Sequence, residues 1–251
     1  MIKKWYNITR TDEFLKGWCH KMKKALKRFE RGAEISNVIA DGKICLVNHN
    51  LDFNKSEILL DVVEFSQADF DRIFEVKTGE WSVEDGWVVG KNPDMCPGMI
   101  ISKDDFFGSV MVEITAKMVS PSTHDINVMV NGEWDLEKDC RGMAYVAGLE
   151  AFWHGNIGFE KSPEYKLTAA TQLFEFDPEA EHNFRLGNID GKVFVIVDGK
   201  LCLEITDPDP LDSSKYGKIG FEAYSSWWKF KDLKVHKLSY EKVDEYYNKE
   251  F

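Results

Sequence analysis

The sequence is short of cysteine and of long apolar runs, and each shortage excludes a class of protein. Its five cysteines are an odd number, widely spaced and without a Cys-x-x-Cys pair, so we expect reduced thiols rather than a disulfide framework or a zinc site. No segment approaches the roughly 18 consecutive apolar residues of a membrane span. The first residues carry no apolar run of the secretory type, so we expect a cytoplasmic protein that does not insert into a membrane.

Positive charge is also scarce, and what there is lies at one end. The chain has 32 Lys and Arg against 43 Asp and Glu, a net charge of −11, and phosphate contacts need a basic surface, so no nucleic-acid partner is expected. Residues 1–31 are the exception, with ten basic and three acidic side chains. Apolar residues recur there at helical spacing between Phe14 and Phe29, which predicts a basic amphipathic helix over 1–34 that packs on an acidic body. The alternative interpretations are a membrane or nucleic-acid element, or the docking element of an assembly protein.

Several signatures of cofactor chemistry are missing. The sequence has no His-Glu-x-x-His motif, no glycine-rich phosphate loop and no Gly-x-Ser-x-Gly elbow, so we expect neither a catalytic transition metal nor an organic cofactor. The turn-rich stretch around Asp207, Asp209 and Asp212 offers carboxylate oxygens of the kind that calcium prefers. A structural calcium ion is therefore the alternative to a plain loop at this point.

From residue 35 onward the pattern changes to short β-runs separated by turns. Asp85-Gly86 and Asp198-Gly199 are the strongest turn signals, and each predicts a tight hairpin. The remaining predicted strands are 43–47, 57–63, 109–118, 124–131, 147–154, 183–187, 218–223 and 228–238. Many short strands at regular spacing predict an all-β antiparallel sandwich over 35–240, followed by a tail over 241–251.

Three of these runs have one apolar side and one polar side. In the first, Ile126, Val128 and Val130 alternate with Asn127 and Asn131. The other two behave in the same way: Leu149, Ala151 and Trp153 alternate with Glu150 and His154, and Phe184 and Leu186 with Asn183 and Arg185. Successive side chains on a strand point to opposite faces, so the apolar sides suit the space between two sheets.

The polar sides contain amides, a carboxylate, an imidazole and a guanidinium, which are unusual on ordinary solvent-facing strands. Such groups hydrogen-bond sugar hydroxyls, while aromatic rings stack on the apolar face of a sugar. Glu150 and His154 are four residues apart, about 13 Å along a strand, and would hold opposite ends of one sugar ring. The alternative is a polar outer face with no function.

These segments also carry a family resemblance. GEWSVEDGWVVG (79–90) and GSVMVEITAKM (108–118) resemble the opening of the 3-keto-disaccharide hydrolase-like domains and of the related YesU-type proteins. AGLEAFW (147–153) resembles their Gly-x-Glu strand, and 182–238 is similar to their closing hairpins. The resemblance spans residues 70–238. It implies a concanavalin A-like jelly-roll sandwich of two antiparallel sheets with a carbohydrate site in the concave sheet, and it places Glu150 at the family's acidic position.

A second resemblance concerns GEWDLE (132–137), which approximates the Glu-x-Asp-x-Glu signature of laminarinase-type glycosidases. It implies that Glu133 is a nucleophile and Glu137 a general acid, projecting with Asp135 from one strand face. Trp134 stands where that family has a branched aliphatic residue, and the acid-rich surroundings favour a loop as the alternative.

Together these observations predict a carbohydrate-active enzyme that hydrolyses or eliminates a glycosidic bond in a small saccharide, such as a 3-keto sugar. Glu150 would act as general acid or base, with His154 assisting proton transfer. The predicted substrate-binding residues are Asn127, Asn131, Glu133, Trp134, Arg185 and Trp227. The alternative is a lectin-like module that binds a glycan without chemistry, and in either case we expect a monomer or homodimer.

Overall fold

The fold was analysed in a computed structural model, which describes residues 39–150 and 157–242. The predicted helix over 1–34, the predicted residue His154 and nearly all of the predicted tail lie outside these residues. Within the described part, helix is confined to α2 (Gln67–Ile73) and the short 3-10 turn η1 (Phe53–Lys55), and no helix there is long and apolar enough to cross a membrane.

One sheet of 13 strands folds into the two layers of an antiparallel sandwich, as predicted. The first layer contains β13 (Thr168–Thr171), β12 (Ile157–Ser162), β11 (Ala144–Leu149), β8 (Ile126–Gly132) and β4 (Phe74–Val76). The second layer contains β16 (Lys200–Thr206), β15 (Lys192–Val197), β14 (His182–Ile189), β7 (Val110–Met118), β3 (Glu57–Val62) and β5 (Glu80–Glu84). Two long strands, β6 (Trp87–Ser102) and β17 (Lys218–Lys237), pass through both layers.

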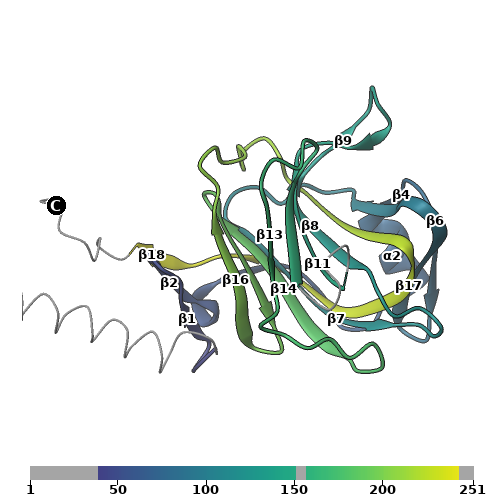
Figure 1. Cartoon of the computed structure of the whole chain (residues 1–251), viewed down its shortest axis with the longest axis horizontal. Helices are drawn as coiled ribbons and strands as arrows, with labels where there is room; N and C mark the ends of the chain where they lie inside the picture. The colour runs from purple at the N-terminus through teal and green to yellow at the C-terminus, as the bar shows by residue number, and fades with distance from the viewer. Residues whose placement is uncertain (1–38, 151–156, 243–251) are drawn as a thin grey trace, which may run out of the picture.

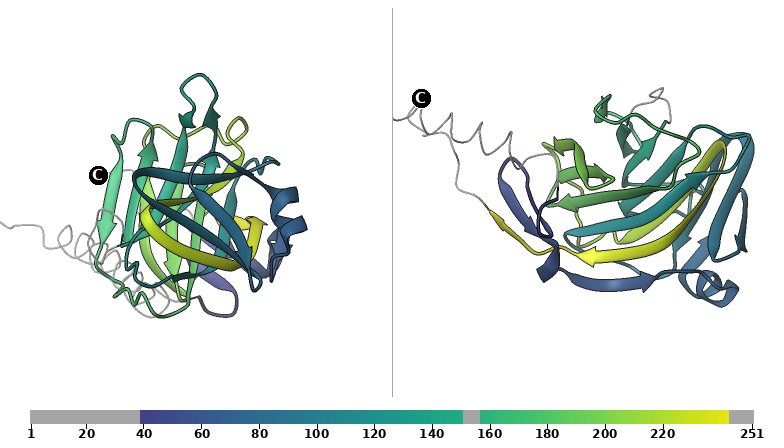
Figure 2. Two further views of the ribbon diagram at one scale, coloured as in Figure 1. Left: turned by 90° about the vertical axis from the view of Figure 1, so that its right-hand side faces the viewer. Right: turned by 90° about the horizontal axis from the view of Figure 1, so that it is seen from below.

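Strand β17 joins the two layers by bending. Its first part pairs with β8 and its second part with β7, and the register shifts between Tyr224 and Ser226. Ser225 has φ of 51°, a left-handed conformation that interrupts the extended chain at this point. The sequence predicted two separate strands here, 218–223 and 228–238, whereas the structure has one strand with strong curvature, visible in the right-hand view of Figure 2.

The main core lies between the layers and is built from the apolar sides of the predicted alternating strands. Ile126, Val128 and Val130 have no exposed surface, and Phe184 and Leu186 face them from the second layer. Phe221 and Phe230, from the two parts of β17, stack with ring centroids 4.1 Å apart. The period-2 pattern therefore predicted the core-facing side correctly on both layers.

A separate three-stranded sheet packs against the outer face of the second layer. It consists of β1 (Lys43–Cys45), β2 (His49–Asp52) and β18 (Tyr240–Lys242). Ile44 and Leu51 from this sheet form an apolar cluster with Met111 and Phe194 of the second layer. Figures 1 and 2 show this small sheet at the end of the molecule opposite α2.

Two local predictions concern turns and strand ends. Both Asp-Gly turns are confirmed: Asp85 and Gly86 have φ of 49° and 81°, and Asp198 and Gly199 have φ of 50° and 76°, the left-handed pair that a tight hairpin needs. The predicted strand over 147–154 is wrong in its extent, because β11 ends at Leu149 and Glu150 has φ of 53°.

Candidate functional site

The outer faces of the two layers point in opposite directions, and the predicted site residues are divided between them. Asn127 lies on the outer face of the first layer, because its neighbours Ile126 and Val128 are in the core. Arg185 and Trp227 lie on the outer face of the second layer, next to the core residues Phe184 and Trp228. The structure therefore does not bring Arg185 and Trp227 together with Asn127.

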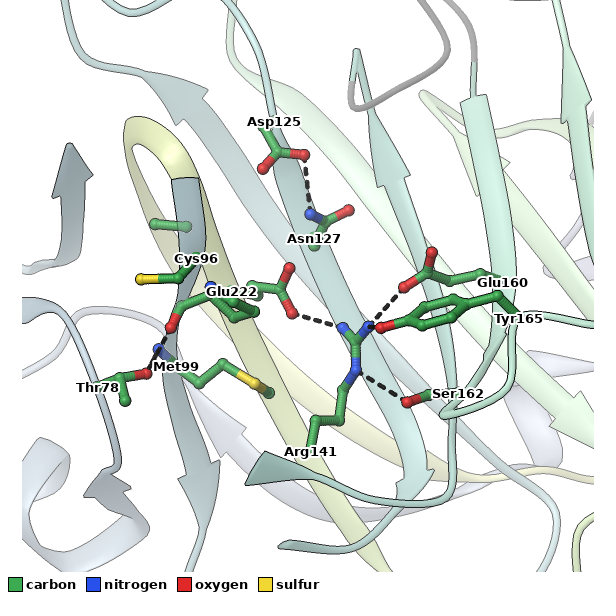
Figure 3. A network of polar contacts seen from close by, with 12 residues as sticks. Thr78, Cys96, Met99, Asp125, Asn127, Arg141, Glu160, Ser162, Tyr165 and Glu222 are labelled. Carbon is green, nitrogen blue, oxygen red and sulfur yellow. Dashed lines mark hydrogen bonds and ion pairs between the residues drawn. The ribbon is translucent and has the colours of Figure 1, made fainter. Parts of the chain in front are cut away.

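The outer face of the first layer carries a network of charged side chains centred on Arg141 (Figure 3). The Arg141 guanidinium forms ion pairs with Glu222 at 2.5 Å and with Glu160 at 2.6 Å. It also donates hydrogen bonds to the hydroxyls of Ser162 and Tyr165, both at 3.2 Å. We name the seven residues of this network and its neighbours the Arg141 cluster: Asp125, Asn127, Arg141, Glu160, Ser162, Tyr165 and Glu222.

The guanidinium bridges strands that are not adjacent. Glu160 belongs to β12 and Glu222 to β17, and β11 and β8 lie between these strands in the sheet order. Neighbouring strands are about 4.8 Å apart, so Arg141 connects positions that are about three strand spacings apart. It reaches them from a hairpin outside the main sheet, formed by β9 (Trp134–Asp135) and β10 (Cys140–Arg141), which projects from the sandwich in Figure 1.

This hairpin contains the laminarinase-like segment. Asp135 accepts hydrogen bonds from the backbone of Glu137 and Lys138 and pairs with the Lys138 ammonium at 2.8 Å, so it caps the turn. Glu137 lies in the exposed turn, and Glu133 accepts a hydrogen bond from the backbone of Met143 at 3.3 Å. The three carboxyls therefore do not project from one strand face, which agrees with the loop interpretation and not with the catalytic one.

Asp125 stands at the start of β8 and differs from the other acids of the cluster. It is 3% exposed and has φ of 78°, and one carboxylate oxygen, Oδ1, accepts a hydrogen bond from the Asn127 amide at 2.9 Å. The other oxygen, Oδ2, is buried without a side-chain hydrogen-bond partner among the described residues, and the backbone N–H of Tyr224 also donates to this carboxyl. Asn127 itself leans over Gly148, where a β-carbon would lie 2.0 Å from the Asn127 side-chain oxygen, so this approach requires glycine.

Burial and like charge change the proton affinity of these acids. Burial raises the pKa of Asp125, the negative charge of Glu222 raises it further, and the pKa reaches about 7. Burial likewise raises the pKa of Glu222 and of Glu160, while the positive charge of Arg141 opposes both rises. The cluster therefore holds one guanidinium and three carboxyls, and burial raises the pKa of each carboxyl.

The same face has an apolar end beside the charged one. Met99, Met129 and Val146 form a small cluster there, and the half-buried ring of Trp134 packs against it. The Lys77 ammonium lies 5.4 Å from the centre of this ring. An aromatic ring on an apolar floor next to fixed polar groups is the usual composition of a small-molecule site.

Glu150 lies at the charged end of this face. It follows Leu149, the last paired residue of β11, whose partner on β8 is Ile126. Asp125 directly precedes Ile126, so Glu150 and Asp125 occupy the same end of neighbouring strands. Glu150 is half-buried, and the residues after it, including His154, are outside the described part of the chain.

Asn131 has a structural environment. It is fully buried with φ of 45°, and its amide nitrogen donates to the backbone carbonyls of Gly108 and Tyr216, at 3.2 and 3.3 Å. Its side-chain oxygen accepts a hydrogen bond from Asn188 at 3.0 Å. These bonds tie the end of β8 to two loops and leave Asn131 out of the Arg141 cluster.

Arg185 belongs to a buried ion network on the second layer. It pairs with Glu113 at 2.9 Å, and His236 contacts the other oxygen of that carboxylate at 3.1 Å. Burial alone would raise the pKa of Glu113, but the hydrogen bond from His236 and the charge of Arg185 lower it to about 2. Trp227, farther along this face, has the Lys91 ammonium 5.1 Å from its ring and borders a shallow hollow of about 340 Å³ with Trp87 and Lys229.

The stretch considered for calcium uses its carboxylates internally. Asp207 is buried, accepts a hydrogen bond from the Tyr145 hydroxyl at 2.8 Å and pairs with Lys161 at 2.8 Å. Asp212 accepts hydrogen bonds from Ser214 within its own turn. Across residues 39–150 and 157–242, no group of three or more His, Cys, Asp or Glu side chains is arranged to hold a metal ion.

Most of the Arg141 cluster was missed by reasoning from the sequence. Glu222 and Glu160 carried a usable signal, because each alternates with apolar core residues such as Phe221 and Phe159. Arg141 gave no such signal, since it enters the face from a hairpin rather than from a strand of the sheet.

A scan of protein-family models and a search of curated proteins found no match. Solved structures are similar in fold. A Bacillus subtilis protein of unknown function with a galectin-like fold matches with a TM-score of 0.58 and 15% identity, over 73% of this chain and 98% of that one. The exoplasmic domain of VIP36, bound to calcium and Man3GlcNAc, matches with a TM-score of 0.55 and 11% identity, over 75% and 93%. The carbohydrate-binding module CBM66 from Bacillus subtilis matches with a TM-score of 0.53 and 14% identity, over 65% and 95%. At these identities the likeness establishes the lectin-like jelly-roll fold.

Proposed function

We propose that this protein binds a small saccharide on the outer face of the first layer. The observation that carries this proposal is the Arg141 cluster itself. The carboxylates of Glu160 and Glu222 are paired with one guanidinium, and the Asn127 amide is bonded to the buried Asp125, beside an apolar floor with Trp134. Carboxylate and amide oxygens accept hydrogen bonds from sugar hydroxyls, and an aromatic ring stacks on the apolar face of a sugar. Two of the similar structures, the carbohydrate-binding module CBM66 and the VIP36 domain bound to Man3GlcNAc, support the same ligand class.

The structure favours this face over the second layer for a physical reason. On the second layer, the guanidinium of Arg185 is paired with Glu113, also contacts Asn183, and lies 5.5 Å from the ring of Phe53. The charge and the hydrogen bonds of Arg185 are therefore satisfied by these neighbouring residues. On the first layer, two carboxyls pair with the one guanidinium, and Oδ2 of a third carboxyl, Asp125, has no side-chain partner among the described residues. An unsatisfied acceptor of this kind is stabilised by a ligand that donates a hydrogen bond.

Binding is tested by titrating the protein calorimetrically with a panel of neutral oligosaccharides. Arg141→Met and Glu222→Gln should weaken binding about tenfold or more, because each removes or unpairs a charged hydrogen-bonding group. Arg185→Lys and Trp227→Phe, on the other layer, should bind like the wild type. Loss of binding in the second pair with retention in the first would move the site to the second layer, and an inert panel would refute the proposal.

A catalytic function, hydrolysis or elimination of a glycosidic bond in a saccharide such as a 3-keto sugar, is the second candidate. One observation favours it: a carboxyl whose pKa is about 7, Asp125, lies at the same strand ends as Glu150. A group that titrates near the working pH is suited to general acid or base catalysis. Glu150 as the acid or base, assisted by His154, remains a prediction of the sequence.

Turnover of a 3-keto disaccharide, followed by release of the free sugars, tests the catalytic candidate. Glu150→Gln should abolish turnover and leave saccharide binding in place. A wild-type protein that binds the panel but turns over no substrate would leave the lectin-like function alone standing.

A further inference from the structure

The charge of the Arg141 cluster bears on which saccharide it takes. Its acids are Asp125, Glu160 and Glu222, and its single cation is Arg141. When all three acids are ionised, the cluster carries two excess negative charges. A ligand with a carboxylate or sulfate would meet repulsion here, whereas a cation would restore neutrality.

Arg141 has little capacity left to bind an anion. A guanidinium has five N–H donors. Four contacts already use them, to Ser162, Glu222, Glu160 and Tyr165. The cluster therefore offers mainly acceptors, and its complement is a ligand group rich in N–H or O–H donors.

Asp125 singles out the position where such a donor is missing. The residue is 3% exposed, and its Oδ2 has no side-chain hydrogen-bond partner within the described part of the chain, although the backbone N–H of Tyr224 donates to this carboxyl. The Asn127 amide donates to the other oxygen of Asp125. Asn127 lies directly opposite Glu222 in the β8–β17 pairing. Figure 3 shows Asp125, Asn127 and Glu222 on the same face of the sheet. Diagonal neighbours on adjacent strands are within reach of long side chains, so one donor group can lie between Asp125 and Glu222.

Resting on the proposed function, we infer that the saccharide bound by the Arg141 cluster is an amino sugar with a free amino group, whose ammonium lies between Asp125 and Glu222. A metal ion is a poorer occupant, because the described acids are not arranged as a metal-binding group. An ammonium supplies three N–H donors and one positive charge, which satisfies Oδ2 and the excess charge together.

Binding of an ammonium should also change the protonation of Asp125. The groups that face Asp125 are Glu222 on β17, Glu160 on β12 and Arg141 on β10, with Glu150 at the neighbouring strand end. A cation beside Asp125 favours its carboxylate form. Near pH 6 the bound amine should therefore drive the proton from Asp125 into the buffer, and the two ionised groups then form the ion pair.

The test compares matched trios of disaccharides in gluco and galacto configuration: the free amine, its N-acetylated form and the neutral hexose form. Calorimetry at pH 6, in two buffers of different ionisation enthalpy, yields both affinity and proton release. We expect the free amine to bind about tenfold or more tightly than its acetylated form, with release of a fraction of a proton. Asp125→Asn should lose both the preference and the proton release.

Each outcome decides between the two proposals. Equal binding of all three forms, or tighter binding of the acetylated one, would overturn the amino-sugar inference and leave saccharide binding intact. Amine preference that persists unchanged in Asp125→Asn would also overturn it. Failure of every trio and of the neutral panel to bind would refute the proposed function, and the inference with it. Thermal unfolding of each variant confirms that it is folded, and Glu113→Asp, on the other layer, serves as the acidic control.

Discussion

At the residue scale, the protein contains two acids, the buried Asp125 and the half-buried Glu113, whose proton affinities move in opposite directions. Asp125 is buried and lies beside the negative charge of Glu222, so its pKa rises to about 7. Glu113 lies between Arg185 and His236, and its pKa falls to about 2. The two acids are on opposite layers of the sandwich, so their effects on stability can be measured separately.

Replacing Asp125 with Asn should stabilise the protein at high pH and not at low pH. The pKa of Asp125 is raised from 3.8 to about 7 on folding, so ionisation costs stability as the pH rises through this window. Above pH 7 the cost approaches about 4 kcal/mol, at about 1.4 kcal/mol for each pKa unit. Urea unfolding should show Asp125→Asn as the more stable protein at pH 8 and as nearly equal to the wild type at pH 4. The same difference at both pH values would contradict the assignment.

Glu113 should show the opposite dependence. Its pKa is lowered from 4.5 to about 2 on folding, so the stability that it contributes is complete above pH 4.5 and is lost as the pH falls toward 2. Glu113→Gln should therefore cost about 3 kcal/mol at pH 7 and progressively less below pH 4.5. The measurement is urea unfolding at pH 7 and pH 3, and a deficit that stays constant would show that the ion pair is not its cause.

At the element scale, the β9–β10 hairpin supplies the one cation that holds the charged face together. Its turn is capped by Asp135, and its last strand residue, Arg141, pairs with two buried carboxylates of the main sheet. Loss of a buried partner usually costs more than the pair contributes, because the remaining charge is left unpaired.

Arg141→Met should therefore destabilise the protein by about 3–5 kcal/mol at neutral pH, since Glu160 and Glu222 lose their counter-ion. Combining it with Glu160→Gln and Glu222→Gln should recover much of that loss, because the neutral amides need no cation. Chemical unfolding of the single and triple variants measures both values. A triple variant no more stable than Arg141→Met would show that packing of the arginine stem, rather than its charge, is what matters.

At the scale of the whole molecule, local patterns in the sequence predicted more of the fold than of the site. Period-2 alternation identified the core-facing side of β8 and β14, and Asp-Gly identified two hairpin turns. Alternation does not predict which layer a strand joins. Asn127 and Arg185 were therefore predicted to belong to one binding site, although they lie on opposite faces of the sandwich. Alternation also predicted the strand ends wrongly at Asn131, Glu150 and Ser225. Each of these residues has a left-handed conformation, which ends or bends the strand, so the alternation of faces does not continue past it.

The site itself depends on contacts distant in sequence. Arg141 and Glu222 are 81 residues apart, and only the order of the strands brings them together. The proposed amino-sugar site likewise depends on the side-by-side placement of β8 and β17, which no local motif specifies. The family resemblance assigned a role to Glu150 and assigned none to Arg141, Glu160 or Glu222.

The most direct test of the account is to map saccharide binding on the folded protein by nitrogen-15 chemical shifts in solution. Titration with the disaccharide trios should shift the backbone signals of Asn127, Gly148 and Glu222 on the first layer. The strands that carry Arg185 and Trp227 should be unaffected. Shifts confined to the second layer, or no shifts with any saccharide, would contradict the claim that the Arg141 cluster is the binding site.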